Sequence, residues 1–205
     1  MINFDNFVKP SDPILSNIAE EIPPDEITSP STKAMIKDML SVAYGEQVDK
    51  GKPLLVGLAA PQIGISKRII LVDTAADGKG NIGNLQVFIN PEISWMSEEE
   101  EEWYEGCFST DHVCGVVARA VKIRVKALNE AGERIEQGYE GYTARIFQHE
   151  IDHLNGKEFV THIIDDANLH WVEDNEFSDY RNNESWRHWE KKCLRAKWMQ
   201  IKGLV

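Results

Sequence analysis

The residues best suited to chemistry in this 205-residue chain are the two histidines of the segment His149-Glu150-Ile151-Asp152-His153. The segment lies in a stretch with helical character, and helical residues four apart share one face. His149 and His153 could therefore point two imidazoles at one divalent metal ion, while Glu150 could reach a metal-bound water without binding the metal. The alternative interpretation is a helix whose polar residues simply face the solvent.

A catalytic metal site with an open position needs a third protein ligand. A third histidine, as in metzincin proteases, would require a longer pattern after His153 that this chain does not complete. A downstream glutamate, as in thermolysin-like proteases, is a second option. The third is a thiolate, and Cys107 is a candidate because it stands in a Gly-containing segment between two strand-like stretches.

Three separated motifs resemble those of peptide deformylases and occur in the same order as in that family. The resemblance runs from about residue 13 to about residue 163, and Asp12-Pro13-Ile14-Leu15 is also similar to the family's opening. Three ordered motifs are far more specific than one. They are Gly57-Leu58-Ala59-Ala60-Pro61-Gln62, Glu105-Gly106-Cys107-Phe108-Ser109 and Gln148-His149-Glu150-Ile151-Asp152-His153.

The resemblance implies a hydrolase that removes the N-formyl group from the formylmethionine of newly made polypeptides and releases formate. Cys107, His149 and His153 would bind the metal, and Glu150 would act as general base and acid. Ferrous iron would be the physiological ion, while zinc, nickel or cobalt would suit the same ligands.

The resemblance also assigns residues to the substrate. The side-chain amide of Gln62 and the backbone N–H of Phe108 would stabilise the oxyanion of the tetrahedral intermediate. Arg119 and Glu105 resemble a structural ion pair of the family, Asp152 could accept a hydrogen bond near the site, and we expect Arg145 to face the solvent. The residues expected to contact the substrate are Val56, Gly57, Glu105, Tyr142 and Ile146.

The chain departs from the family pattern at positions near the substrate groove rather than near the metal. Leu55 stands where the first motif usually has Gly, and Phe108 where the second usually has Leu. Thr110-Asp111 replaces an aliphatic residue and Pro. These departures concern peptide preference.

Composition agrees with an enzyme of a reducing compartment. The hydrophobic content of 42% suffices for one core, and three scattered cysteines argue against a disulfide framework. We expect a cytoplasmic, bacterial-type protein, because no signal peptide, transit peptide or membrane span is visible. The net charge of −12 disfavours a general nucleic-acid binder.

Periodicity predicts an α+β fold, with antiparallel sheets packed around a central metal-binding helix and an additional C-terminal helix. Ser31 is expected to cap the first helix, and Pro91 to end the second strand. The expected helices are Thr32–Gln47 and Tyr142–Leu154, the latter stopped by Gly156, and the expected strands are Lys67–Asp73, Leu85–Asn90 and Val121–Leu128.

We expect a catalytic domain over residues 1–165 and an extension over residues 166–205. Residues 181–205 hold seven Lys or Arg and two Glu, a local balance of +5. Helical spacing of four residues predicts a basic amphipathic helix, capped by Asn183 or Ser185. Such a helix could contact ribosomal RNA near the site where nascent chains emerge. The four residues are Trp186, Trp189, Cys193 and Ala196.

Two other classes of function stay open. The His-Glu-x-x-His motif by itself suggests a metalloprotease, although Gln62 and Cys107 argue against one. A deformylase-like fold that only binds ligands is the other, and the intact catalytic set argues against it.

Overall fold

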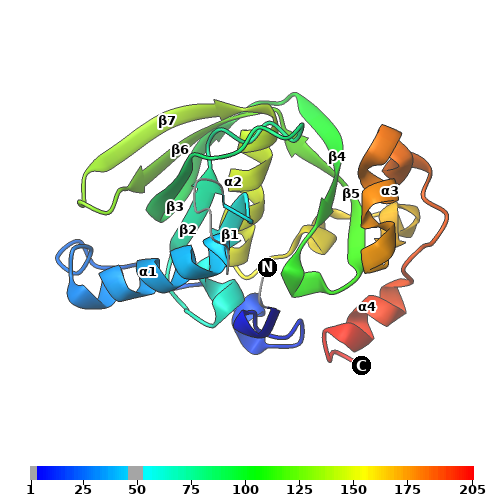
Figure 1. Ribbon diagram of the computed structural model, residues 1–205, viewed down its shortest axis with the longest axis horizontal. Helices are drawn as coiled ribbons and strands as arrows, with labels where there is room; N and C mark the ends of the chain where they lie inside the picture. The colour runs from blue at the N-terminus through cyan, green and yellow to red at the C-terminus, as the bar shows by residue number, and fades with distance from the viewer. Residues whose placement is uncertain (1–3, 46–52) are drawn as a thin grey trace.

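The computed structural model describes residues 4–45 and 53–205. Two antiparallel sheets enclose helix α2, Gly141–Leu154 (Figure 1). The predicted α+β class is therefore confirmed, as is an additional C-terminal helix, α4. The larger sheet has the order β1-β2-β3-β6-β7 and the smaller β4-β5-β8. The strands are β1 Gly57–Ala59, β2 Ile69–Asp73, β3 Leu85–Met96, β4 Glu100–Gly106, β5 Val113–Ala120, β6 Lys122–Leu128, β7 Arg134–Glu140 and β8 Leu169–Trp171.

Short 3-10 turns and three further helices complete the described part of the chain. The α-helices besides α2 are α1 Pro30–Tyr44, α3 Phe177–Arg181 and α4 Arg195–Ile201. The 3-10 turns are η1 Phe4–Asn6, η2 Pro13–Ser16, η3 Ala60–Ile63, η4 Phe108–Thr110, η5 Phe159–His162, η6 Asp166–Asn168, η7 Asp174–Glu176 and η8 Asn182–His188. No helix in the described part of the chain combines the length and apolar character needed to cross a membrane.

Helix α1 begins earlier than predicted. The hydroxyl of Ser29, not that of Ser31, accepts a hydrogen bond from the backbone N–H of Thr32. Pro30 then occupies the first turn, where its missing N–H costs nothing. The helix ends at Tyr44, and the last two residues of the expected helix lie outside the described residues.

Strand β3 does not end at Asn90, contrary to the prediction from Pro91, but continues to Met96. The pairing of β3 with β6 shifts register between Ile89 and Glu92. Pro91 is tolerated because it lies at this irregularity, where a ladder hydrogen bond is already interrupted.

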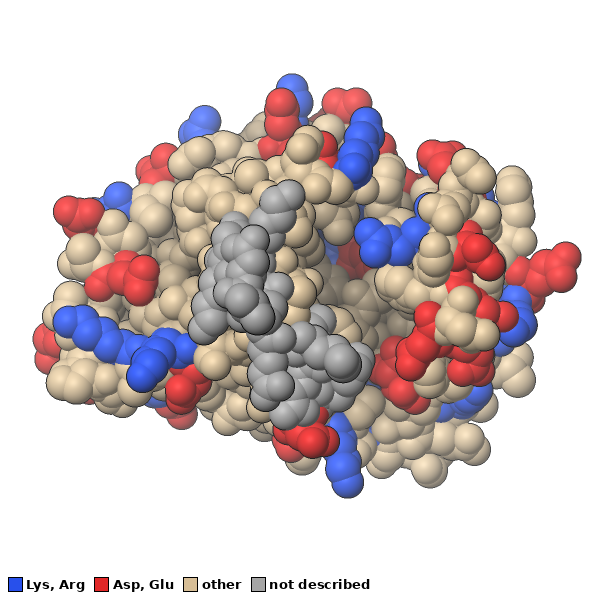
Figure 2. Space-filling model, viewed as in Figure 1, with Lys and Arg blue, Asp and Glu red and all other residues tan. Residues whose placement is uncertain are grey.

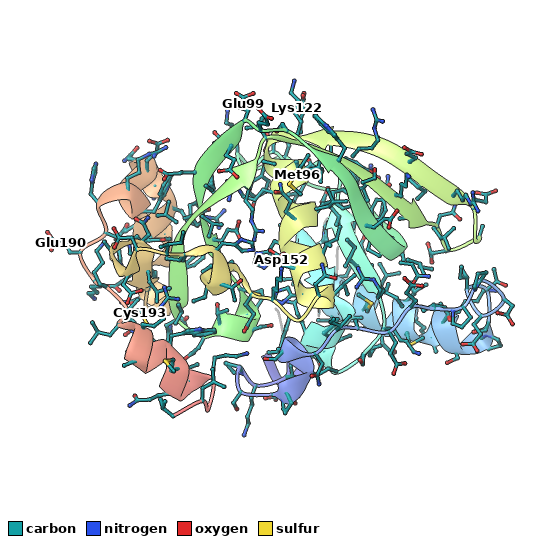
Figure 3. All side chains as sticks on the ribbon, turned by 180° about the vertical axis from the view of Figure 1, so that it is seen from behind. Met96, Glu99, Lys122, Asp152, Glu190 and Cys193 are labelled. Carbon is teal, nitrogen blue, oxygen red and sulfur yellow. The ribbon has the colours of Figure 1, made fainter. Side chains whose placement is uncertain are left out.

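The two sheets meet at a corner formed by the β3–β4 and β5–β6 connections. Ser97 and Lys122 exchange hydrogen bonds there, from Ser97 N to Lys122 O at 2.8 Å and from Lys122 N to Ser97 Oγ at 3.0 Å. Figure 3 labels Met96, Glu99 and Lys122 at this corner, with Asp152 on α2 below it. The sheets diverge from the corner, and α2 fills the space between them.

The predicted amphipathic helix across residues 186–196 is wrong. Trp186 belongs to a 3-10 turn in which Asn183 and Glu184 have positive φ angles of 52° and 55°, and α4 begins only at Arg195. Trp186 packs into an apolar cluster with Cys114, whereas Cys193 packs into another with Val113. Adjacent residues of β5 face opposite sides of the sheet, so one straight helix could not serve both clusters.

Candidate metal centre and active site

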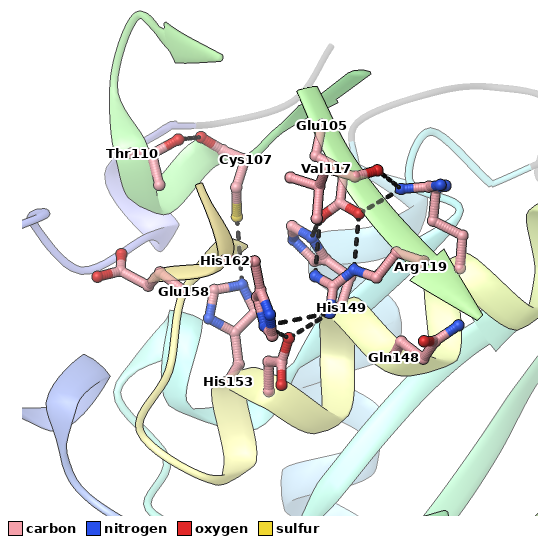
Figure 4. A network of polar contacts seen from close by, with 12 residues as sticks. Glu105, Cys107, Thr110, Val117, Arg119, Gln148, His149, His153, Glu158 and His162 are labelled. Atoms are coloured by element: carbon pink, nitrogen blue, oxygen red, sulfur yellow. Dashed lines mark hydrogen bonds and ion pairs between the residues drawn. The ribbon is translucent and has the colours of Figure 1, made fainter. Parts of the chain in front are cut away.

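Cys107, His149 and His153 converge between the two sheets (Figure 4). Their candidate ligand atoms all lie within 4.8 Å of one another, and Cys107 Sγ is 3.4 Å from His153 Nε2. Helix α2 supplies both histidines, as the sequence spacing predicted. Cys107 comes from the smaller sheet, at the point where β4 ends and η4 begins.

The arrangement fits a divalent metal ion. One thiolate and two imidazoles match a catalytic tetrahedral site, in which neighbouring ligand atoms lie about 3.5 Å apart. Nδ1 of His149 is 2.8 Å from Glu105 Oε2. Donation from Nδ1 to this carboxylate leaves Nε2 of His149 with a lone pair for a metal, and carboxylate support of this kind is usual at histidine ligands.

Glu105 organises the charges behind the site. Arg119 forms two hydrogen bonds to its carboxylate, each of 2.9 Å, and Arg145 adds one of 2.8 Å. Burial alone would raise the pKa of Glu105, but Arg119 and His149 hold it well below its usual value. The ion pair between Glu105 and Arg119 is therefore confirmed, and Asp152 extends it by contacting both Arg119 and His162.

The expectation that Arg145 faces the solvent is wrong, because its residue is only 6% exposed. Besides Glu105, its guanidinium donates to the carbonyl oxygens of Val117 and Glu101. These three acceptors offset the cost of burying the charge. Sequence position placed Arg145 on α2, but only the approach of β4 and β5 supplies its partners.

Glu150 is buried and directly follows His149, one of the three candidate metal ligands. Burial raises the pKa of Glu150 to about 7, and its Oε2 has no hydrogen-bond partner among the described residues. A β-carbon placed on Gly57 would come within 2.3 Å of Glu150 Oε1. Gly57 therefore leaves the space that the carboxylate occupies, and a carboxyl group with a near-neutral pKa is suited to accepting and returning a proton.

Gln62 is held with its amide nitrogen toward the sulfur atom of Cys107. Its Oε1 accepts a hydrogen bond of 2.7 Å from the backbone N–H of Ala59. Its Nε2 lies 3.0 Å from Cys107 Sγ and 3.3 Å from Ser109 Oγ. The role of Ser109 was missed from the sequence, although its place two residues after Cys107 was a usable signal. Phe108 opens η4 at the same site.

The predicted substrate contacts divide into two groups. Ile146 lies against Gly57, while Val56 and Tyr142 pack at the edge of the same apolar core. Tyr142 also contacts Trp103 of β4, with ring centroids 6.5 Å apart, a neighbour that the sequence analysis did not identify. The carboxylate of Glu105 is already engaged by Arg119, Arg145 and His149, so its side chain has little capacity left for a substrate.

The family model described as polypeptide deformylase matches residues 4–168. The chain belongs to the polypeptide deformylase family. It is 48% identical over 153 residues to the peptide deformylase of Carboxydothermus hydrogenoformans, covering 75% of this chain and 89% of that one. It is 43% identical over 156 residues to the peptide deformylase of Halothermothrix orenii, covering 76% and 91%.

Solved structures of the family agree. A class I type b peptide deformylase from Acinetobacter baumannii with bound Met-Ala-Ser gives a TM-score of 0.67 at 36% identity, covering 77% of this chain and 96% of that one. The peptide deformylase of Thermotoga maritima gives 0.65 at 35%, covering 78% and 97%. Like these deformylases the chain is a hydrolase, and its residues 169–205 lie beyond the family match.

Proposed function

We propose that this chain removes the formyl group from N-terminal formylmethionine of nascent polypeptides. The observation that carries the proposal is the cluster of Cys107, His149 and His153, with the Gln62 amide at the Cys107 sulfur and the buried Glu150 next to His149 on α2. The Acinetobacter baumannii relative was solved with a Met-Ala-Ser peptide, which is the kind of product this reaction would leave.

We further propose that Cys107, His149 and His153 hold ferrous iron, with zinc, nickel or cobalt as possible substitutes. When bound, the ion supplies a Lewis acid and lowers the pKa of water. Glu150 accepts the proton of the attacking water and returns it to the leaving amine. The formyl C–N bond breaks, and formate and a free N-terminus result.

The remaining residues bind and orient the formyl peptide. The amide of Gln62 and the backbone N–H of Phe108 donate to the oxyanion. Gly57 allows the substrate backbone to come close. Val56, Tyr142 and Ile146 form the apolar contacts for the methionine side chain, since Ile146 belongs to one apolar cluster and the other two pack against it.

The test is formate release from a formyl-Met dipeptide by anaerobically prepared, metal-loaded protein. We expect Glu150→Gln to retain the metal but to release formate at least ~100-fold more slowly, the usual contribution of a general base. Near-normal turnover by the metal-loaded variant would contradict the assigned role. Cleavage of an unformylated oligopeptide instead would favour a metalloprotease.

The proposed location is the bacterial-type cytoplasm, where formylated chains are made. None of Cys107, Cys114 and Cys193 forms a disulfide, which suits a reducing compartment.

Ribosome association through the basic tail is a separate proposal that rests on the charge surplus of residues 181–205. The contacts of these basic side chains indicate instead that they hold the tail against the rest of the chain. Lys191 pairs with Glu176 and Arg195 with Asp166, while Lys197 lies over the ring of Trp171. Figure 2 shows acidic side chains as prominent as basic ones on the side that carries α3.

Co-sedimentation with ribosomes at low and raised salt tests this proposal. A basic contact with RNA predicts binding that weakens as salt increases and that is lost in a Lys191→Glu/Lys197→Glu variant. Equal sedimentation of both proteins, or indifference to salt, would leave the tail without this role.

A further inference from the structure

A buried ion pair ties the end of α4 to the segment behind the metal cluster. Lys202 Nζ lies 2.7 Å from Glu158 Oε2, and each side chain is only 7% exposed. Lys202 directly follows α4, and Glu158 directly precedes η5. Opposite charges in an interior must stay paired, since removing one leaves the other uncompensated. The pair therefore constrains two segments that are far apart in sequence.

The segment held by Lys202 touches a predicted metal ligand. The ring of Phe159 stacks on the imidazole of His149, with centroids 6.2 Å apart and planes inclined by 18°. Figure 4 shows Glu158 next to His153 and Cys107, with its carboxylate pointing away from them. Its charge thus faces the C-terminal extension, while the next residue faces the site.

A second set of contacts holds the same segment. Arg195, the first residue of α4, donates to the carbonyl oxygens of Val160 at 3.3 Å and Ile163 at 2.7 Å. Cys193 and Trp198 share one apolar cluster with Phe159 and Val160, and Cys107 packs against the edge of that cluster. Cys193 is labelled beside α4 in Figure 3.

We propose that residues 193–203 position the metal ligands. Lys202 and Arg195 fix residues 158–163, and Phe159 in turn fixes the orientation of the His149 ring. Lys202 is thus a positioning residue, not a catalytic one. The inference rests on the proposed metal site and makes the extension part of the catalytic unit. Because coupling free energies are reciprocal, metal binding must also tighten the docking of α4.

Hydrogen exchange of the unaltered protein tests this reciprocity. We expect the backbone N–H groups of Trp198 and Lys202, which donate to the carbonyl oxygens of Leu194 and Trp198 at the two ends of α4, to exchange at least ~10-fold more slowly in zinc-loaded than in metal-free protein. Amides of α1, which packs on the larger sheet, serve as the control. Their exchange rates should change little. Slowing in α2 with no change in α4 would overturn the proposal.

A paired variant provides the second test. Glu158→Gln/Lys202→Met removes both charges, so that no unpaired charge stays buried. The control is Glu176→Gln/Lys191→Met, which removes an ion pair on the surface of the same extension. At a temperature where circular dichroism shows each protein folded, we measure zinc affinity by competition with a chelator.

We expect at least ~10-fold weaker zinc binding by the first variant and wild-type binding by the control. Wild-type affinity in the folded first variant would overturn the proposal. If that variant does not fold, hydrogen exchange alone decides. Absence of zinc binding by the wild-type chain would reject the proposed metal site itself, and the titration distinguishes this result from a loss of coupling.

Discussion

At the scale of single residues, the site depends on side chains whose surroundings come from both sheets. Glu150 and His149 are neighbours in sequence, yet their environments differ. The His149 ring lies against the carboxylate of Glu105, whereas the carboxylate of Glu150 lies against Gly57. The carboxylate of Glu105 is paired with cations and, among the described residues, that of Glu150 is not. The two carboxylates therefore have very different proton affinities.

Gly57→Ala tests the space reserved for Glu150. The added methyl would lie 2.3 Å from Glu150 Oε1 and 2.8 Å from a methyl group of Ile146, so the carboxylate must move. A displacement of about 1 Å at a reacting group can cost ~100-fold in rate, and we expect a loss of that order in kcat/KM for formate release.

Gly138→Ala is the matched control, because a β-carbon there would find its nearest neighbour at 3.8 Å. Equal activities of the two variants would show that the Glu150 carboxylate does not need its present position.

At the scale of elements, local capping decides where a helix begins. Ser29 and Ser31 both precede the apolar positions of α1, and only Ser29 has its hydroxyl on the backbone of Thr32. Pro30 decides between them, because proline is well suited to the first helical position and Ser29 then becomes the cap.

We expect Ser29→Ala to lower the free energy of unfolding by about 1 kcal/mol, the usual value of a lost N-cap. Ser31→Ala, on the exposed side of the first turn, should change it by less than about 0.5 kcal/mol. Urea denaturation of both variants measures the difference. The reverse order would restore Ser31 as the cap.

At the scale of the whole molecule, residues 177–186 of the C-terminal extension pack on one face of the smaller sheet. Tyr180 and Trp186 are almost fully buried in one cluster with Cys114 and Val116 of β5. Replacing one large buried aromatic residue by Ala typically costs about 3–5 kcal/mol, and a whole domain is stable by only about 5–15 kcal/mol.

A chain ending at residue 168 should therefore lose cooperative unfolding, although the family match ends there. Thermal unfolding followed by circular dichroism, compared with the full chain, checks this expectation. A truncated protein that melts as cooperatively and at the same temperature would show that the extension is only an appendage.

The pH dependence of stability offers another measurement. Burial, and then the nearby Lys192, lower the pKa of His170 to about 4. In the unfolded chain the pKa is about 6.5. As the pH falls from about 6.5 to about 4, the unfolded chain gains a proton that the native protein excludes. Native stability should therefore fall, by on the order of 2 kcal/mol.

Metal-free wild type and His170→Gln, denatured with urea at pH 7 and pH 4.5, test this sign. The wild type should lose more stability than the variant over this range, because the amide of Gln does not titrate. Parallel losses in the two proteins would show that His170 is not the group responsible.

The sequence by itself determined the features that depend only on residues close together in the chain. Helical periodicity placed His149, Glu150 and His153 on one helix in the right relation, because hydrogen bonding within a helix sets that geometry locally. Alternation likewise identified β6. Cys107 and Gln62 could be joined to the histidines only through a family resemblance, since no local rule links residues so far apart.

Only the tertiary structure decided which distant groups meet. In the folded chain Arg145 is buried against Glu105, and β3 continues beyond Pro91. The residues of the expected tail helix pack into two separate apolar clusters. Lys202 is also paired with Glu158. The reason is physical. The periodicity of a sequence segment indicates which of its residues are buried, but the packing of sheets and helices determines which residues they contact.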